Sequence, residues 1–147
     1  MRIVCIGGGP AGLYFGILMK MLDPSHVISV VERNRPYDTF GFGVVFSDAT
    51  LDNFEKYDLP SYQRITREFA YWDDIAVIHD GVRTVSGGHG FAGIGRKQML
   101  ILLQQRARDL GVDLQFESEF RSAEEYRKDY DLVVGCDGIN SMVRKEY

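Results

Sequence analysis

A glycine-rich turn near the start of the chain constrains the fold more than any other feature. Residues 7–12 read GGGPAG and lie between two apolar stretches, Ile3–Ile6 and Ala11–Leu22. The first stretch is β-branched and does not alternate, so it predicts a strand buried on both faces, as in a parallel sheet. The second fits a buried helix that ends at Asp23-Pro24, and Val27–Val31 fits another buried strand. One βαβ unit with a right-handed crossover therefore accounts for the first 32 residues.

The glycines of this turn match the GxGxxG pattern through Gly7, Gly9 and Gly12. On its own the pattern is weak, but here it stands between a strand and a helix, and Glu32 follows 20 residues after the last glycine. In a dinucleotide site Gly7 permits the tight turn, Gly9 lets the backbone approach a pyrophosphate, and Gly12 lets the helix pack close to the strand. The phosphates would lie at the start of the helix, where Pro10 completes the turn.

The remaining cofactor contacts predicted from this unit come from Ala11, Glu32 and Arg33. Ala11 belongs to the first turn of the helix, next to the expected phosphates. The Glu32 carboxylate would accept hydrogen bonds from the 2′- and 3′-hydroxyls of a ribose, and it disfavours a 2′-phosphate there. Arg33, a cation beside this acid, makes a 2′-phosphate there less unfavourable. The alternative is a tight turn and a surface acid in an α/β domain that binds no nucleotide.

The sequence after residue 32 predicts an inserted antiparallel segment, followed by further strands of the parallel sheet. Asp80-Gly81 is a strong hairpin turn between two β-branched runs, so an antiparallel hairpin is inserted at about residues 65–87. The expected elements, in order, are a loop over Arg33–Phe46, a helix near Ala49–Tyr57, strands over Arg67–His79 and Val82–Val85, a helix from Arg96 that Gly111 caps, a strand over Val112–Phe116, a charged and solvated helix and turn over Ser118–Tyr130, and a last buried strand over Leu132–Cys136.

Composition limits the class of protein. The chain has 147 residues, of which 45% are hydrophobic, and a net charge of −4, so we expect a single folded domain over residues 1–147 and no nucleic-acid partner. Glycines and a proline break the longest uncharged stretch, which excludes a membrane span or a signal peptide within it. Cys5 and Cys136 are isolated, so we expect no disulfide and no metal site, and we expect the protein to lie in the cytosol.

A second motif lies at the end of the last expected strand. Asp137-Gly138 gives the strand a sharp exit, Ser141 is placed to cap a following helix, and Arg144 lies one turn into that helix. By itself this pattern also fits a strand, a turn and a capped helix without a ligand. A third feature is Arg96, which opens its helix with a positive charge. That charge is unfavourable at a helix N-terminus, which supports a functional role for it.

Together the three motifs resemble, in order along the whole chain, those of the flavoprotein aromatic hydroxylases, the para-hydroxybenzoate hydroxylase-like monooxygenases. The resemblance implies that Asp137 and Gly138 lie near FAD, and that Ser141 and Arg144 lie near the incoming nicotinamide nucleotide. It also implies that Arg96 reaches the phosphate or ribityl region of FAD. Leu132 replaces the polar residue that usually begins the second motif. The loop Gly41–Ser47 resembles that of the branch acting on aryl-CoA thioesters, such as 2-aminobenzoyl-CoA or salicylyl-CoA, and of the related indole-type hydroxylases.

This resemblance implies a Rossmann-like FAD/NAD(P)-binding α/β fold and a monooxygenase activity. In this family NAD(P)H reduces FAD, dioxygen forms a flavin C4a-hydroperoxide, and an aromatic substrate is hydroxylated. The cofactor carries that chemistry, so no side chain is expected to be a catalytic acid or base, including His26, His79 and His89. Because family members are much longer, we expect the chain to be the N-terminal portion of such an enzyme and to be inactive alone.

Two other functions stay open at this point. The chain could be a non-catalytic module that holds NAD or FAD, because the βαβ unit recognises the ADP half that both share. It could also belong to another class of FAD oxidoreductase, such as a reductase or a halogenase. Arg96 and the Asp137-Gly138 motif favour FAD over NAD through the resemblance.

Overall fold

The chain forms two compact units in the computed structural model, which describes the backbone of residues 1–147 and every side chain except that of Asp48. The first unit joins Met1–Phe40 to Met99–Tyr147, and the second is Gly41–Gln98. The later boundary falls inside helix α4 (Arg96–Asp109), so this helix begins in the second unit and ends in the first.

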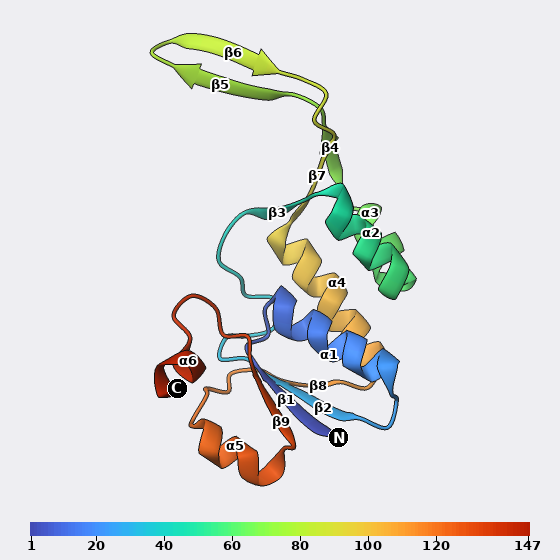
Figure 1. The fold of residues 1–147 in the computed structure, drawn as a ribbon, viewed down its shortest axis with the longest axis vertical. Helices are drawn as coiled ribbons and strands as arrows, with labels where there is room; N and C mark the ends of the chain where they lie inside the picture. Colours follow the sequence, from blue (N-terminus) through green and yellow to red (C-terminus); the bar gives the residue numbers. More distant parts are fainter. The chain divides into compact units, whose positions relative to one another are not determined.

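The first unit is built on a four-stranded parallel sheet in the order β8-β2-β1-β9 (Figure 1). Its strands are β1 (Arg2–Ile6), β2 (Val27–Val31), β8 (Asp113–Gln115) and β9 (Leu132–Gly135). The strand order reverses at β1, because β2 and β8 lie on one side of it and β9 on the other. In open parallel sheets, ligands bind outside the carboxyl ends of the strands at this kind of switch point.

Helices cover both faces of this sheet. Gly16 of α1 (Pro10–Leu22) lies against one face, where an added Cβ would be 3.5 Å from Ile28 and 3.7 Å from Val30. Helix α5 (Ala123–Asp129) lies on the opposite face (Figure 1). Aromatic side chains of the segment that includes it pack on a buried cluster there. Burial on both faces explains why β1 and β2 are almost entirely apolar, apart from Arg2 and Ser29. The sheet and its helices confirm the predicted α/β fold with a mainly parallel sheet.

Two expectations about the first unit need correction. The segment 118–130 contains the expected charged helix, but it is not simply solvated, because Phe120, Tyr126 and Tyr130 pack against the buried Val4 and Ile6. Strand β9 is half-buried rather than buried, since no strand among the described residues pairs with its outer edge.

The two cysteines are free and occupy neighbouring strands. Cys5 is buried in β1, and Cys136 is half-buried directly after β9. Burial, helped by the proximity of Cys136, raises the pKa of the Cys5 thiol to about 12. Cys5 therefore stays protonated at neutral pH and acts as a small core residue.

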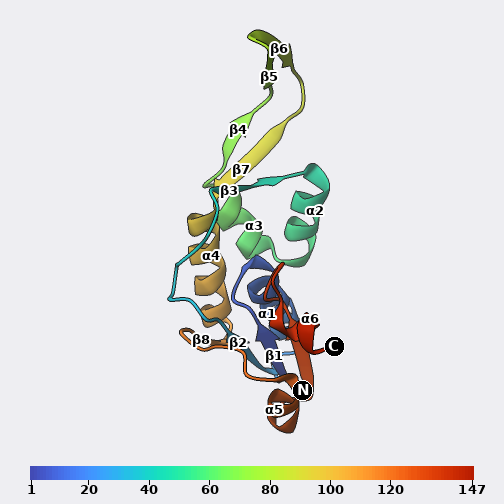
Figure 2. The ribbon, with the colours of Figure 1, turned by 90° about the vertical axis from the view of Figure 1, so that its left-hand side faces the viewer.

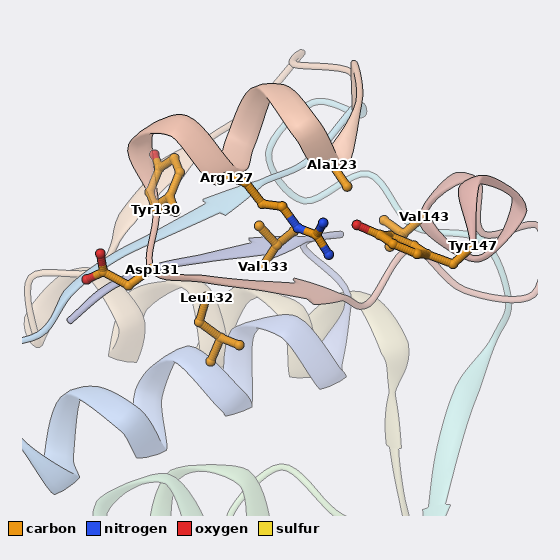
Figure 3. A pocket seen from close by; sticks show the side chains of 8 residues that line it. All are labelled: Ala123, Arg127, Tyr130, Asp131, Leu132, Val133, Val143 and Tyr147. Atoms are coloured by element: carbon orange, nitrogen blue, oxygen red, sulfur yellow. The ribbon is translucent and has the colours of Figure 1, made fainter.

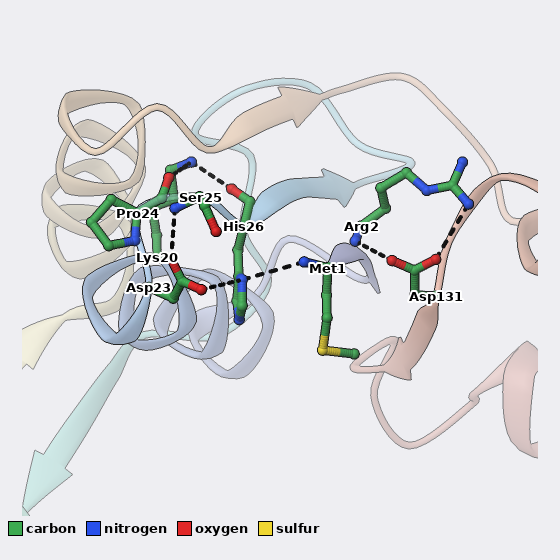
Figure 4. Close-up of polar contacts among 8 residues, drawn as sticks. All are labelled: Met1, Arg2, Lys20, Asp23, Pro24, Ser25, His26 and Asp131. Carbon is green, nitrogen blue, oxygen red and sulfur yellow. Dashed lines mark hydrogen bonds and ion pairs between the residues drawn. The ribbon is translucent and has the colours of Figure 1, made fainter.

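Polar contacts tie the amino-terminal edge of this sheet (Figure 4). The Asp131 carboxylate accepts from the Arg2 backbone N–H at 2.7 Å and from its guanidinium at 3.3 Å, which holds the start of β9 beside β1. Lys20 donates to the carbonyls of Pro24 and His26, which fixes the connection between α1 and β2. The glycine turn lies at the opposite edge of the sheet, where the strands end.

The second unit is mainly antiparallel. One sheet has the order β3-β7-β4, and β5 and β6 form a separate hairpin that continues past β4 and β7 (Figure 2). Asp80 and Gly81 have φ of 48° and 77°, as a two-residue type I′ turn requires, so the inserted hairpin is confirmed. Its elements are β3 (Gly43–Phe46), α2 (Asp48–Tyr57), α3 (Leu59–Thr66), β4 (Ala70–Trp72), β5 (Ile75–His79), β6 (Val82–Ser86) and β7 (Phe91–Gly95).

The expected loop over Arg33–Phe46 is wrong for its last four residues. They form β3, because their backbone pairs with β7 in a register that local sequence does not reveal. Helix α3 was not anticipated either. Its signal is nevertheless in the sequence, since Asp58 caps the helix and Pro60 stands in the first turn.

Among the described residues, no helix has both the length and the apolarity that crossing a membrane requires.

We predict that Ile17→Ala lowers the free energy of unfolding by about 2–5 kcal/mol. The reason is that Ile17 is fully buried and belongs to the buried side of α1. The matched control in the same helix is Leu22→Ala, where the side chain is 76% exposed and the change should stay within about 0.5 kcal/mol. Urea unfolding of both variants measures the difference. Equal losses would contradict the packing described for α1.

Candidate functional site

The turn after β1 is packed against the end of β9. Gly7 has a φ of +113°, and a Cβ added there would lie 2.4 Å from the carbonyl oxygen of Cys136. A Cβ added at Gly12 would lie 2.0 Å from the carbonyl oxygen of Gly7. Both distances are far too short for a side chain, so these two positions require glycine. The start of α1 is thereby held against β1 and β9 at the switch point of the sheet.

Gly9 differs from these two glycines because it faces open space. A Cβ added there would meet no described atom within 4 Å, and Gly9 is the N-cap of α1, with Pro10 in the first turn. None of the side chains described in that turn is acidic. The first N–H groups of a helix have no partner within it, and they carry the positive end of the helix dipole. The residues present therefore fit a pyrophosphate that approaches at Gly9.

Glu32 lies beside the same turn, at the end of β2. Its Oε2 accepts a hydrogen bond of 2.7 Å from the backbone N–H of Gly8, and a Cβ at Gly8 would lie only 2.8 Å from the Glu32 Cβ. Its Oε1 accepts from the backbone N–H of Asn34 at 2.8 Å and from the Asn34 side-chain amide at 2.7 Å. The structure thus brings the predicted acid to the glycine turn. It adds Asn34, which sequence reasoning missed, and leaves Arg33 exposed.

The Asp137 side chain is engaged within its own loop. Its Oδ1 accepts from the Ser141 hydroxyl at 2.6 Å, and its Oδ2 accepts from the backbone N–H groups of Met142 at 2.6 Å and Val143 at 3.3 Å. These residues begin helix α6 (Met142–Glu146), so Asp137 stabilises the start of that helix. Burial alone would raise the pKa of the Asp137 carboxyl. The hydrogen bonds from Ser141 and the two backbone groups outweigh it and lower this pKa below its usual value.

The other predicted residues of this motif complete the loop. Gly138 has a φ of +83°, which favours glycine. Ser141 is the N-cap of α6, as expected, since its hydroxyl accepts from the backbone N–H of Arg144 at 2.9 Å. The Arg144 guanidinium donates to the carbonyl of Ile139. The loop is therefore held internally and follows directly on Cys136, the residue that contacts Gly7.

Arg96 belongs to the second unit, where it opens α4 beside the loop that starts at Gly41. Its backbone N–H donates to the carbonyl of Phe42 at 3.1 Å, and a Cβ added at Gly41 would lie 3.7 Å from the Arg96 side chain. The structure brings Arg96 together with the start of the Gly41–Ser47 loop. It does not place either of them relative to the glycine turn of the first unit.

A separate hollow of about 230 Å³ lies between α5, β9 and α6 (Figure 3). None of the predicted cofactor residues lines it. Arg127 lies in the hollow with its guanidinium carbon 5.1 Å from the centre of the Tyr147 ring. The lining residues are Ala123, Arg127, Tyr130, Asp131, Leu132, Val133, Val143 and Tyr147. Across the described part of the chain, no group of three His, Cys, Asp or Glu side chains is arranged to hold a metal ion.

We predict that alanine at two glycines of the turn changes the free energy of unfolding by very different amounts. Gly12→Ala should lower the free energy of unfolding by about 3 kcal/mol or more, or prevent folding, because α1 must move away from Gly7. Gly9→Ala should change it by no more than about 1 kcal/mol, because the new methyl group enters open space. Thermal and urea unfolding would test this pair. A Gly12→Ala protein as stable as the wild type would refute the close approach.

We predict that Ser141→Ala moves the Asp137 pKa up towards its usual value, because a hydrogen bond to the ionised form is lost. A lowered folded-state pKa stabilises the protein above the unfolded value, about 3.9, and this stabilisation disappears as the pH falls through the folded pKa. In the variant that loss therefore occurs at higher pH. A carboxyl NMR titration measures it. Ser122→Ala is the matched control, because Ser122 caps α5 and does not contact Asp137. An unchanged Asp137 pKa in Ser141→Ala would show that the cap does not hold the carboxylate.

Comparison with proteins of known sequence identifies relatives over nearly the whole chain. The chain is 49% identical over 144 residues to a salicyloyl-CoA 5-hydroxylase from Streptomyces sp, an alignment that covers 98% of the chain and 28% of that protein. It is 28% identical to a 3-hydroxy-4-methyl-anthranilyl-[aryl-carrier protein] 5-monooxygenase from Streptosporangium sibiricum, with 99% of the chain and 40% of the relative covered. The chain thus spans well under half the length of either. No family model matches it.

Solved structures share the fold. The tetrameric form of 2-methyl-3-hydroxypyridine-5-carboxylic acid oxygenase matches 99% of the chain and 41% of its own length, with a TM-score of 0.82 at 24% identity. CtdE, solved in complex with FAD and a substrate, matches 83% of the chain and 31% of its own length, with a TM-score of 0.68 at 17% identity. The chain is therefore homologous to part of these two monooxygenases, and its fold matches part of these two solved structures.

Proposed function

We propose that the chain provides the FAD-binding part of an aromatic-ring monooxygenase that uses NAD(P)H and O₂. One observation carries the proposal: a glycine turn whose open position, Gly9, and whose oriented acid, Glu32, lie together at the switch point of a parallel sheet. The relatedness to aromatic monooxygenases supports it independently.

In this proposal FAD lies with its ADP half on the first unit. The ribose hydroxyls donate to Glu32, and the pyrophosphate lies against the segment from Gly7 to Gly12 and the first turn of α1, which includes Pro10 and Ala11. Arg33 flanks the ribose. FAD supplies the redox chemistry when bound, and the residues of the chain bind and orient it and keep water from the site.

The other motifs have positioning roles. Asp137 stabilises the loop that contains Gly138 by accepting a hydrogen bond from Met142. This loop lies beside the glycine turn, because Cys136, which precedes it, contacts Gly7. Arg96 contributes a positive charge for the phosphate or ribityl region of FAD. Ser141 and Arg144 lie on the side where NAD(P)H approaches. We assign no acid or base catalyst and no metal to this chain.

The proposed substrate is a small aromatic molecule, and an aryl-CoA thioester is the favoured class. The support is the 49% identity to a salicyloyl-CoA 5-hydroxylase, together with the Gly41–Ser47 loop noted in the sequence. A reducing compartment such as the cytosol suits the two free cysteines.

The test uses the protein that contains this chain and follows both bound flavin and NAD(P)H oxidation. Glu32→Ala should lower FAD affinity by about tenfold or more, because hydrogen bonds from the ribose to a charged group are lost. Glu124→Ala is the matched control, since this exposed acid lies in the first turn of α5. A wild-type protein that binds NAD but shows no flavin absorbance would favour a non-catalytic module. Unchanged flavin content in Glu32→Ala would reject the assigned site.

A further inference from the structure

Asn34 makes contacts that nothing in the dinucleotide pattern requires. Its backbone N–H and its side-chain amide both donate to the same oxygen of Glu32, Oε1, at 2.8 Å and 2.7 Å. The other oxygen, Oε2, accepts from the backbone N–H of Gly8 at 2.7 Å. Asn34 and Glu32 are both partly buried, so water competes less well for these bonds than at an exposed site.

These three donors give the two carboxylate oxygens different roles. Each oxygen of an ionised carboxylate offers about two lone-pair positions. Asn34 occupies both positions of Oε1, whereas Gly8 occupies only one position of Oε2. The remaining acceptor position of Glu32 is therefore on Oε2, the oxygen beside the glycine turn.

The terminal torsion of a glutamate is broad, so the carboxylate plane must be fixed by its partners. The backbone around Glu32 is already held, because its N–H donates to Gln115 at 2.8 Å and its carbonyl accepts from Ser118 at 3.0 Å. The carbonyl of Asn34 accepts from Glu117 at 3.1 Å, which fixes Asn34 in turn. Asn34 is thus held in place, so its side-chain amide can fix the position of Oε1 and with it the orientation of Oε2.

We propose that Asn34 is a positioning residue for nucleotide recognition: it holds the Glu32 carboxylate so that Oε2 alone receives one ribose hydroxyl of the adenosine half. This inference rests on the proposed function, which places a dinucleotide at the glycine turn, and it refines the expectation that Glu32 accepts from two hydroxyls. Glu32 makes the contact with the ribose. Asn34 acts through it.

The test measures ligand affinity rather than turnover. FAD binding to the apoprotein is followed by flavin fluorescence, and ADP, 2′-deoxy-ADP and 3′-deoxy-ADP compete with it. We expect Asn34→Ala to weaken ADP binding by about five- to twentyfold, because one of the three hydrogen bonds that orient the charged carboxylate is lost. Asn34→Ser, whose short hydroxyl can donate in the same way more weakly, should restore part of the affinity.

The deoxy nucleotides separate positioning from general damage to the fold. If Asn34 acts through a single hydroxyl, its substitution costs little affinity for the one analogue that lacks that hydroxyl and retains its cost for the other. Asn53→Ala is the matched control, since the side-chain amide of Asn53 donates to the carbonyl of Ala49 within α2 and not to Glu32. Equal losses for all three nucleotides, or no loss for any, would overturn the inference. A wild-type protein that binds neither FAD nor ADP would instead overturn the proposed function.

Discussion

The close approach of α1 to the ends of β1 and β9 is the constraint on which the rest of the site depends. An atom at the Cβ position of Gly12 would lie 2.0 Å from Gly7, and one at Gly7 would lie 2.4 Å from Cys136. Two glycines therefore bring a helix N-terminus, a strand end and the Asp137 loop to one edge of the sheet. The opposite, amino-terminal edge is held separately, by the hydrogen bonds between Arg2 and Asp131.

Three polar groups lie at this edge, and contacts within the chain already hold each of them in place. The start of α1 offers N–H groups beside the open position at Gly9. Glu32 is oriented by Gly8 and Asn34, and Asp137 is oriented by Ser141 and by the first N–H groups of α6. Preorganisation of this kind lowers the entropy that binding must overcome. In the proposed function, Asn34 and Ser141 therefore contribute by orienting Glu32 and Asp137.

Much of the first unit could be predicted from sequence because its signals are local. The buried runs at β1 and β2, the glycines between them and the acid at Glu32 all lie within one βαβ unit. The cap at Ser141 and the turn at Asp80-Gly81 are also local chemistry. What could not be predicted depends on distant pairing: β3 exists because β7 lies beside it, and Phe120 is covered because α5 folds onto the sheet. The role of Asn34 depends on side-chain geometry that no spacing rule encodes.

The most direct test of the account is a crystal structure of the protein that contains this chain, grown with FAD. The account predicts a pyrophosphate beside Gly9, within hydrogen-bonding distance of the first N–H groups of α1, and an adenosine ribose hydroxyl on Oε2 of Glu32. A dinucleotide bound away from this turn, or a ribose that bypasses Glu32, would contradict it.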